Sequence, residues 1–393
     1  MIEIKDVASD DFSNKLSLRY YPRSLKVSAK ENFVTPSRMI TDTEYNRKAD
    51  YSNQTKLDDH VSTITQYFNE TDILSFIHKN GAMKKLSGKI AAFTKVSIDA
   101  PITALSLRRS YNKEWPMLSL DQIQTFLRFL DIAEGRLSTR SLPPFIYDSY
   151  PSQVITEFCK QNDDNEPIIW LDLKEDETLF KKKVDIILTQ VKEKRLKVVG
   201  FQMGRFDRFE DYNVNLDYVY SKLHKEYVLL LLEGAYKTFR QYYSGPSKLH
   251  YHSFENFDLI SPTRFERGGG SKKSNEKIGE EFKRVRFFQP ADVSLESYGN
   301  MGMEHSAIKG YVDQNMKKVL EEIESIKNGN PPQLGQSNKL LQQLKGLSTI
   351  QQIKEGNLEL NYISKRIRQN ECFNYLEEKQ EFGSVVKRQL RNK

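Results

Sequence analysis

The sequence predicts an α/β protein: a (β/α)8 barrel of the TIM type at residues 1–300, followed by a helical extension at residues 301–393. Two observations favour this fold. From about residue 90 to residue 260, short apolar runs alternate with amphipathic helical patterns, which is typical of parallel β-α units. The chain of 393 residues is also long enough for one barrel-sized domain and an extension. An open, doubly wound sheet would produce much the same alternation.

The first 60 residues contain short strand-like pieces at 15–21 and 24–27. Residues 42–56 are polar and rich in turn-forming residues, and we expect an exposed loop there.

The best-marked element of the barrel region is a helix at 118–132. Ser119 is placed to cap its amino end, apolar residues recur at helical spacing, and Gly135 marks its stop. Residues 91–98 form an apolar run of β type that ends at Asp99. The remaining elements that we expect are strands at 145–147, 168–171, 197–201 and 227–232, and helices at 179–191, 216–224 and 236–243.

Past residue 300 the pattern becomes helical. Helices are expected at 306–328, 338–354 and 358–380, with a linker at 331–337 that contains two prolines. Because isolated helices of this length are marginally stable, we expect their apolar stripes to dock on the barrel or on a partner.

Residues 254–268 form the most informative segment. An apolar run at 257–260 carries one carboxylate, Asp258, and breaks at a proline; Arg264 and Arg267 follow before three glycines. A carboxylate at the end of a buried strand, beside an arginine-bearing loop, suits attack on a sugar that is held by its phosphates. The alternative interpretation is a strand that ends at a proline, with solvated arginines on the loop.

The order Phe257-Asp258, Pro262-Thr263-Arg264, Arg267-Gly268 resembles the nucleophile segment of the tRNA-guanine transglycosylase family. Residues 32–38 are similar to the opening hairpin of these enzymes. The resemblance implies that Asp258 is a nucleophile and that Arg264 and Arg267 lie near nucleic acid. The three cysteines of the family's zinc site have no counterpart after Arg267, so the resemblance is to a remote member.

Several expected strands end in an acidic or amide residue. In a β/α barrel the active site lies at the carboxyl ends of the strands, where side chains from different strands converge. Each residue taken alone is also compatible with a helix cap or a loop carboxylate. The set consists of Asp99, Asp148, Asp172, Gln202 and Asp258.

The resemblance implies particular roles for some of these residues. Asp148 and Gln202 would read the edge of a base, and Gly204 and Gly234 would belong to the backbone turns beside it. Met203 stands where the family usually has glycine. Asp99 falls where the family has a general acid/base, but the surrounding Asp-Ser-Gly-Gly signature is absent.

The implied activity is that of a pentosyltransferase, in which a 7-deazaguanine replaces guanine in tRNA or DNA. Asp258 would attack C1′ of the sugar, giving a covalent glycosyl-enzyme that the incoming base resolves. The target base would first be extruded from its stack. Cationic side chains would hold the phosphates; we expect this role for Arg264, Arg267, Lys272 and Lys273.

The charge balance is compatible with nucleic acid as a partner. The formal net charge is +7, from 60 Lys and Arg against 53 Asp and Glu. Basic residues cluster at 272–286 and 387–393, where they could neutralise phosphates. The first cluster is equally compatible with a solubilising loop, and a solubilising tail is the favoured interpretation of the second.

Other classes are disfavoured by composition. No apolar run approaches the roughly 20 residues that span a bilayer, so we expect a cytoplasmic protein that does not bind membranes. The two cysteines argue against a disulfide framework and a thiolate zinc site. The six histidines form no metal-binding pair with a neighbouring acid, and neither a metal nor a cofactor is expected.

Two further functions stay open. One is a nucleic-acid-binding or scaffold subunit that keeps the barrel without catalysis, within a homo- or hetero-oligomer. The other is an unrelated β/α-barrel hydrolase that uses paired carboxylates, as glycosidases do.

Overall fold

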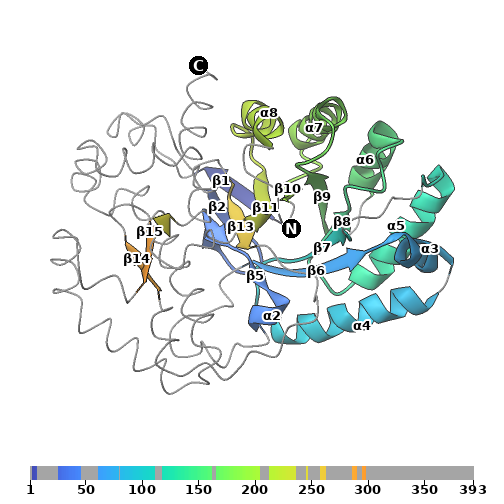
Figure 1. Ribbon diagram of the computed structural model, residues 1–393, viewed down its shortest axis with the longest axis horizontal. Coiled ribbons are helices and arrows are strands. Elements are labelled where there is room, and N and C mark those ends of the chain that lie inside the picture. The colour runs from blue at the N-terminus through green and yellow to red at the C-terminus, as the bar shows by residue number, and fades with distance from the viewer. Residues whose placement is uncertain are drawn as a thin grey trace.

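The protein has a mixed α/β fold in which parallel strands alternate with helices (Figure 1). The computed structural model describes residues 2–6, 25–45, 61–78, 80–110, 117–161, 165–203, 212–235, 245–246, 257–262, 286–289 and 294–297.

The parallel strands form two sheets. The larger sheet has the order β4 (Ser37–Arg38), β13 (Leu259–Pro262), β11 (Leu229–Ala235), β10 (Val198–Gln202), β9 (Glu166–Asp172) and β8 (Thr139–Leu142). The smaller sheet has the order β5 (Ile40–Thr41), β6 (Ser62–Phe68) and β7 (Thr103–Arg109).

Among the described residues, the edges of the two sheets meet at both ends. Met39 alone separates β4 from β5, so these strands are successive parts of one extended segment. Strand β7 lies beside β8, where side chains from β8 bond to carbonyl groups of β7. The Thr139 hydroxyl donates to the Thr103 carbonyl at 2.8 Å, and the Ser141 hydroxyl donates to the Leu105 carbonyl at 2.7 Å.

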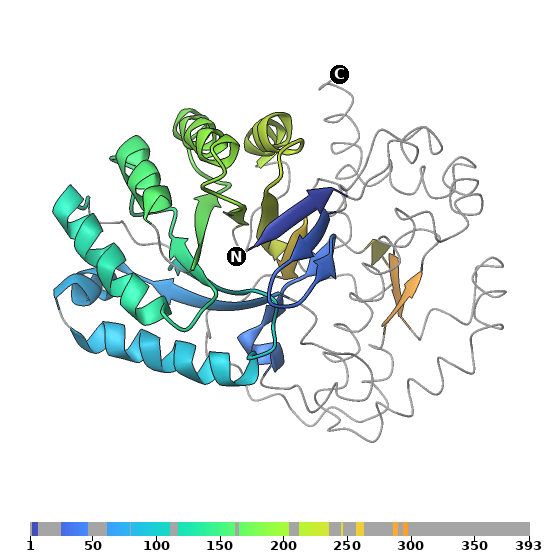
Figure 2. The ribbon, with the colours of Figure 1, turned by 180° about the vertical axis from the view of Figure 1, so that it is seen from behind.

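Helices lie along the outside of the strands in both views (Figures 1 and 2). Their bounds are α2 (Asp42–Tyr45), α3 (Glu70–His78), α4 (Asn80–Val96), α5 (Leu120–Glu134), α6 (Pro151–Lys160), α7 (Glu177–Lys192) and α8 (Asn213–Leu223). Several of the starts are fixed by side-chain caps, including α3, where the Asn69 side chain accepts from the Asp72 amide. Ser119 and Gln122 form a capping box at α5, and Asp176 accepts from the Thr178 and Leu179 amides at α7.

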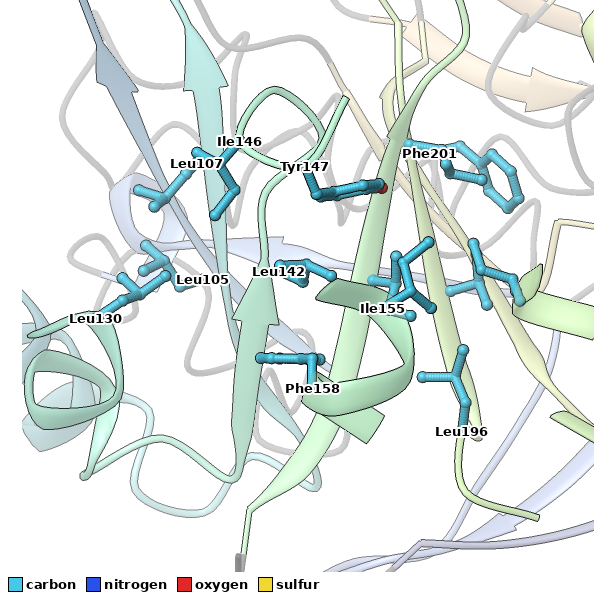
Figure 3. Packing of buried hydrophobic residues seen from close by; sticks show 14 of the residues in the cluster. Leu105, Leu107, Leu130, Leu142, Ile146, Tyr147, Ile155, Phe158, Leu196 and Phe201 are labelled. Carbon is cyan, nitrogen blue, oxygen red and sulfur yellow. The ribbon is translucent and has the colours of Figure 1, made fainter. Parts of the chain in front are cut away.

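The alternation of side chains along the strands produces two apolar clusters. Residues of one parity pack against the helices, as Leu105, Leu142 and Phe201 do in Figure 3. Residues of the other parity, including Trp170 and Leu231, form the second cluster. We call the side of the strands that carries the second cluster the inner face. Because successive strand residues point to opposite faces, the parity of a residue decides which cluster it joins.

A small antiparallel sheet completes the second cluster. It consists of β1 (Glu3–Asp6), β2 (Leu25–Ser28) and β3 (Phe33–Val34). Its apolar side chains, among them Leu25 and Val27, are buried with Trp170. A further antiparallel sheet has the order β12 (Gly245–Pro246), β15 (Ser294–Ser297) and β14 (Arg286–Gln289).

Several predicted elements are confirmed. The helices expected at 118–132, 179–191 and 216–224 correspond to α5, α7 and α8. The strands expected at 24–27, 168–171, 197–201 and 227–232 correspond to β2, β9, β10 and β11.

Two predicted strands are wrong. Residues 91–98 fall mostly in helix α4, because Leu86, Ile90 and Phe93 bury one helical stripe. Residues 145–147 form part of a turn, and the strand lies just before them as β8. All four residues of β8 are buried, although three of them are polar. Thr139 and Ser141 can be buried because they bond to carbonyl groups of β7, so the strand has no apolar run that would mark it in the sequence.

Other expectations fall on residues that the structure does not describe. These are the strand at 15–21, the helix at 236–243, most of the loop at 42–56 and the whole extension at 301–393. Of the helices that are described, none has both the length and the apolar character needed to cross a membrane.

We predict that Gly200→Ala destabilises the protein. A Cβ at Gly200 would lie 2.2 Å from Cε3 of Trp170, whose indole is wholly buried and donates to the Leu105 carbonyl. Overpacking of this kind costs about 1–3 kcal/mol, which a urea unfolding curve would measure. Gly88→Ala, at an exposed position of α4 where nothing lies within 4 Å of the new Cβ, is the control. It should stabilise by about 0.5–1 kcal/mol. Equal effects of the two changes would contradict the packing described for Trp170.

Candidate functional site at the carboxyl ends of the strands

The inner face changes from apolar to polar toward the carboxyl ends of its strands. Along β11, Leu229 and Leu231 are followed at the same parity by Glu233. Along β7, Ala104 is followed by Ser106. We call the polar residues gathered there the carboxyl-end cluster; it consists of Thr65, Ser106, Arg108, Gln202 and Glu233.

Glu233 is the centre of the carboxyl-end cluster. Its side chain is only 1% exposed, so its charge requires partners within the protein. The Thr65 hydroxyl donates to Oε1 at 2.6 Å, the Ser106 hydroxyl donates to Oε2, and Arg108 Nη1 lies 3.5 Å from Oε2. These donors come from β6 and β7, so the carboxylate joins the smaller sheet to the larger one.

Gln202 and Arg108 extend the network. Gln202 ends β10 and is paired in register with Glu233 of β11 and Asp172 of β9. Its amide donates to the Ser106 hydroxyl and to the Leu107 carbonyl, both at 2.9 Å. Arg108 donates to the Met203 carbonyl, just past the end of β10. A carboxylate, a guanidinium and an amide thus meet within one buried region.

Gly234 adopts a backbone conformation that the cluster requires. Its φ of 94° lies in the region that favours glycine. A Cβ there would lie 2.7 Å from the Met203 carbonyl oxygen and 3.2 Å from Nη1 of Arg108. Gly234, predicted to belong to a backbone turn, lies within β11 at an irregularity of its pairing with β13, beside the guanidinium.

Asp258 lies at the opposite ends of the strands. It directly precedes β13, and its neighbour Leu259 is paired with Leu231, upstream of Glu233. Its side chain has no exposed surface. Oδ2 accepts from the Leu230 amide at 2.8 Å, and Oδ1 lies 3.4 Å from the Thr35 hydroxyl, which donates to it. This environment suits a carboxylate that fixes the start of β13, and it leaves no oxygen exposed to attack a sugar.

Asp148 and Asp99 also lie apart from the carboxyl-end cluster. Asp148 is in the turn after β8, with its side chain 48% exposed and bound to Lys183 of α7. Asp99 does not end a strand: it is an exposed residue in the turn between α4 and β7, at the amino end of β7. The residues expected to meet in one pocket, Asp258, Asp148 and Gln202, therefore occupy three separate environments.

Five predicted site residues lie outside the described part of the chain: Gly204, Arg264, Arg267, Lys272 and Lys273.

Within the described residues, no group of three or more His, Cys, Asp or Glu side chains could hold a metal ion. The donor set of the carboxyl-end cluster, with its single carboxylate opposite a guanidinium, likewise suits an organic polar group better than a cation.

Sequence reasoning missed most of the carboxyl-end cluster. Glu233 directly follows the apolar run of β11, so its position could have been found by extending that strand by one residue. Thr65, Ser106 and Arg108 belong to β6 and β7, whose mixed composition carries no clear strand pattern. Gln202 alone was identified in advance, as the residue that ends its strand.

Comparison with known proteins adds no assignment. No protein-family model matches this chain, and no curated protein matches its sequence.

We predict that Asp258→Ala destabilises the protein by about 1–3 kcal/mol, because the buried Leu230 amide loses its acceptor. The midpoint of urea unfolding measures this loss. Asp99→Ala removes a carboxylate from an exposed turn and should change stability by less than about 0.5 kcal/mol. An Asp258→Ala protein as stable as Asp99→Ala would refute the structural role of Asp258.

A second prediction concerns the buried ion pair. Arg108→Met leaves the Glu233 carboxylate without its cation and should cost about 3–5 kcal/mol in unfolding free energy. The double variant Arg108→Met, Glu233→Gln should cost clearly less than the sum of the two single changes. Arg109→Met, at the exposed neighbouring position, serves as control. Additive losses in the cycle would show that the two groups are not coupled.

Proposed function

We propose that the parallel strands close into a (β/α)8 barrel. The support is the succession of neighbours. Strand β13 pairs with β4, Met39 leads from β4 into β5, and β5, β6 and β7 pair in turn. Side-chain hydrogen bonds join β7 to β8, and β8 to β11 pair in chain order before β13. In such a barrel the carboxyl-end cluster lies at the mouth, where β/α barrels bind their ligands.

We propose further that this mouth binds a nucleobase of a nucleic acid, and that the protein is a nucleic-acid-binding barrel of the transglycosylase type. The observation that carries this proposal is the buried meeting of Glu233, Arg108 and Gln202. A carboxylate accepts from ring and exocyclic N–H groups, a guanidinium donates to a ring carbonyl, and an amide does both. A guanine-like edge presents all of these groups together.

The burial of these residues supports selectivity. Polar groups with little access to water reject a ligand that leaves them unpaired far more strongly than an apolar pocket rejects a poor fit. A nucleobase that binds at the carboxyl-end cluster must replace the hydrogen bonds that Thr65, Ser106 and Met203 now make within it. Only a ligand with matching donors and acceptors can do so at low cost in free energy.

A second candidate is the base-exchange transferase itself, which would replace guanine by a 7-deazaguanine in tRNA or DNA. The segment Phe257-Asp258 to Arg267-Gly268 favours it. Attack by Asp258 would require its carboxylate to leave the Leu230 amide and the Thr35 hydroxyl and to turn toward the mouth. The buried position of Asp258 ranks this candidate below the binding function.

We expect guanine and 7-deazaguanine to bind to the full-length protein, and Glu233→Gln to weaken that binding. Loss of one charge-assisted hydrogen bond costs about 1.5–3 kcal/mol, or about a 10- to 150-fold rise in Kd. Isothermal titration calorimetry with each free base measures the change. Glu134→Gln, the same substitution at a buried glutamate on α5, should leave the affinity unaltered. Failure of both bases to bind, or equal binding by Glu233→Gln, would refute the proposal.

Incorporation of labelled guanine into tRNA or DNA separates the two candidates. A binding protein gives no incorporation. If incorporation occurs, Asp258→Asn tests the nucleophile, because it keeps an acceptor for the Leu230 amide while removing the carboxylate. Exchange that persists in Asp258→Asn would exclude Asp258 as the attacking group.

A further inference from the structure

Lys183 joins three parts of the chain at the carboxyl-terminal side of the strands. It belongs to α7 and has no exposed surface. Its Nζ lies 2.5 Å from Oδ1 of Asp148, in the turn after β8, and it also bonds to Oε1 of Glu175, in the turn after β9. The Pro144 carbonyl accepts from it at 3.4 Å, and the Tyr147 ring centroid lies 4.5 Å away.

The position of Lys183 on α7 is one that an apolar residue would normally occupy. Phe180, Val184 and Ile187 of the same stripe are wholly buried in the apolar cluster against the strands. An ammonium in this stripe is stable only when carboxylates and carbonyl groups replace its lost hydration. The two turns therefore stay attached to α7 for as long as Lys183 keeps these partners.

The two carboxylates that share Lys183 differ in their contact with water. The Asp148 side chain is 48% exposed, whereas that of Glu175 is 10% exposed. Burial raises the pKa of Glu175 to about 7; Lys183 opposes this shift, and Asp148 and Asp172 add to it. These are the charged groups that face Glu175, and α8 adds the uncharged Asn215, whose amide donates to the Glu175 carbonyl.

We propose that Lys183, Glu175 and Asp148 form a latch in which a proton on Glu175 decides how firmly the turn after β8 is held to helix α7. With the proton present, Lys183 has one charged partner, Asp148, and the charges balance. When the proton leaves, two carboxylates compete for one ammonium. Asp148 is then the partner that is released, because water already solvates half of its side chain. The latch does not depend on the proposed function.

The direction of the pH dependence follows from linkage. The folded protein binds the Glu175 proton more tightly than the unfolded chain does, because the pKa rises from 4.5 to about 7 on folding. The stabilisation of the folded protein by the Glu175 proton is complete below pH 4.5, and it is lost as the pH rises toward about 7. The turn after β8 is thus held in mildly acidic solution and loosened above neutrality.

Hydrogen–deuterium exchange of the full-length protein tests the latch. The amides of residues 145–150, corrected for intrinsic exchange, should exchange about tenfold faster at about pH 8 than at about pH 6. Glu175→Gln keeps the size and one acceptor of the side chain but cannot ionise, so its corrected rates should be the same at both values. Lys183→Met should exchange rapidly at both.

The control is Glu177→Gln, which alters an exposed glutamate of α7 that pairs with Lys181. It should keep the pH response of the unaltered protein. If Lys183→Met does not fold, the comparison of Glu175→Gln with Glu177→Gln still decides the question. Identical pH responses in these two variants, or no response in the unaltered protein, would overturn the proposal.

Discussion

The buried pair of Glu233 and Arg108 is the interaction on which the carboxyl ends of the strands depend. A carboxylate with so little exposed surface must find donors, and it finds them on two strands of the smaller sheet while it belongs to the larger one. The same contact therefore fixes the relative position of the two sheets and gathers the polar groups of the carboxyl-end cluster. Under the proposed function, stability and recognition are coupled, since a ligand that binds Glu233 would compete with the bonds that hold the sheets together.

The helices and central strands could be predicted because their local patterns agree with their final packing. Capping residues and a helical stripe mark α5, and unbroken apolar runs mark β10 and β11. Strand β8 and the strands of the smaller sheet could not be recognised in the same way. Their inward positions carry threonine, serine and arginine, which are buried only because another strand supplies the partner. The partners are 36 positions away in the chain for Thr139 and Ser141 of β8, and 127 and 168 positions away for Ser106 and Thr65 of the smaller sheet.

The candidate site was predicted in part. Placing Gln202 at a strand end required only the length of an apolar run. Asp258 was misjudged as a strand-end residue because an aspartate beside an apolar run can lie at either end of a strand, and only the pairing of β13 with β11 decides which. The presence of an aspartate at position 258 is explained by its bonds to the Leu230 amide and the Thr35 hydroxyl. Loss of a carboxylate that accepts from a buried backbone amide leaves that amide unsatisfied, which by itself lowers stability.

Trp170 offers a spectroscopic consequence of the packing on the inner face. The chain has two tryptophans, and this one is wholly buried, with its indole N–H bound to a carbonyl of β7. An indole in such surroundings emits at shorter wavelength than one in water. It also lies two residues before Asp172, the register partner of Gln202, so a base bound at the carboxyl-end cluster as proposed would alter the field around the fluorophore. With Trp115 replaced by phenylalanine, the tryptophan emission of the protein would come from this single position and would respond to a ligand bound at the carboxyl-end cluster.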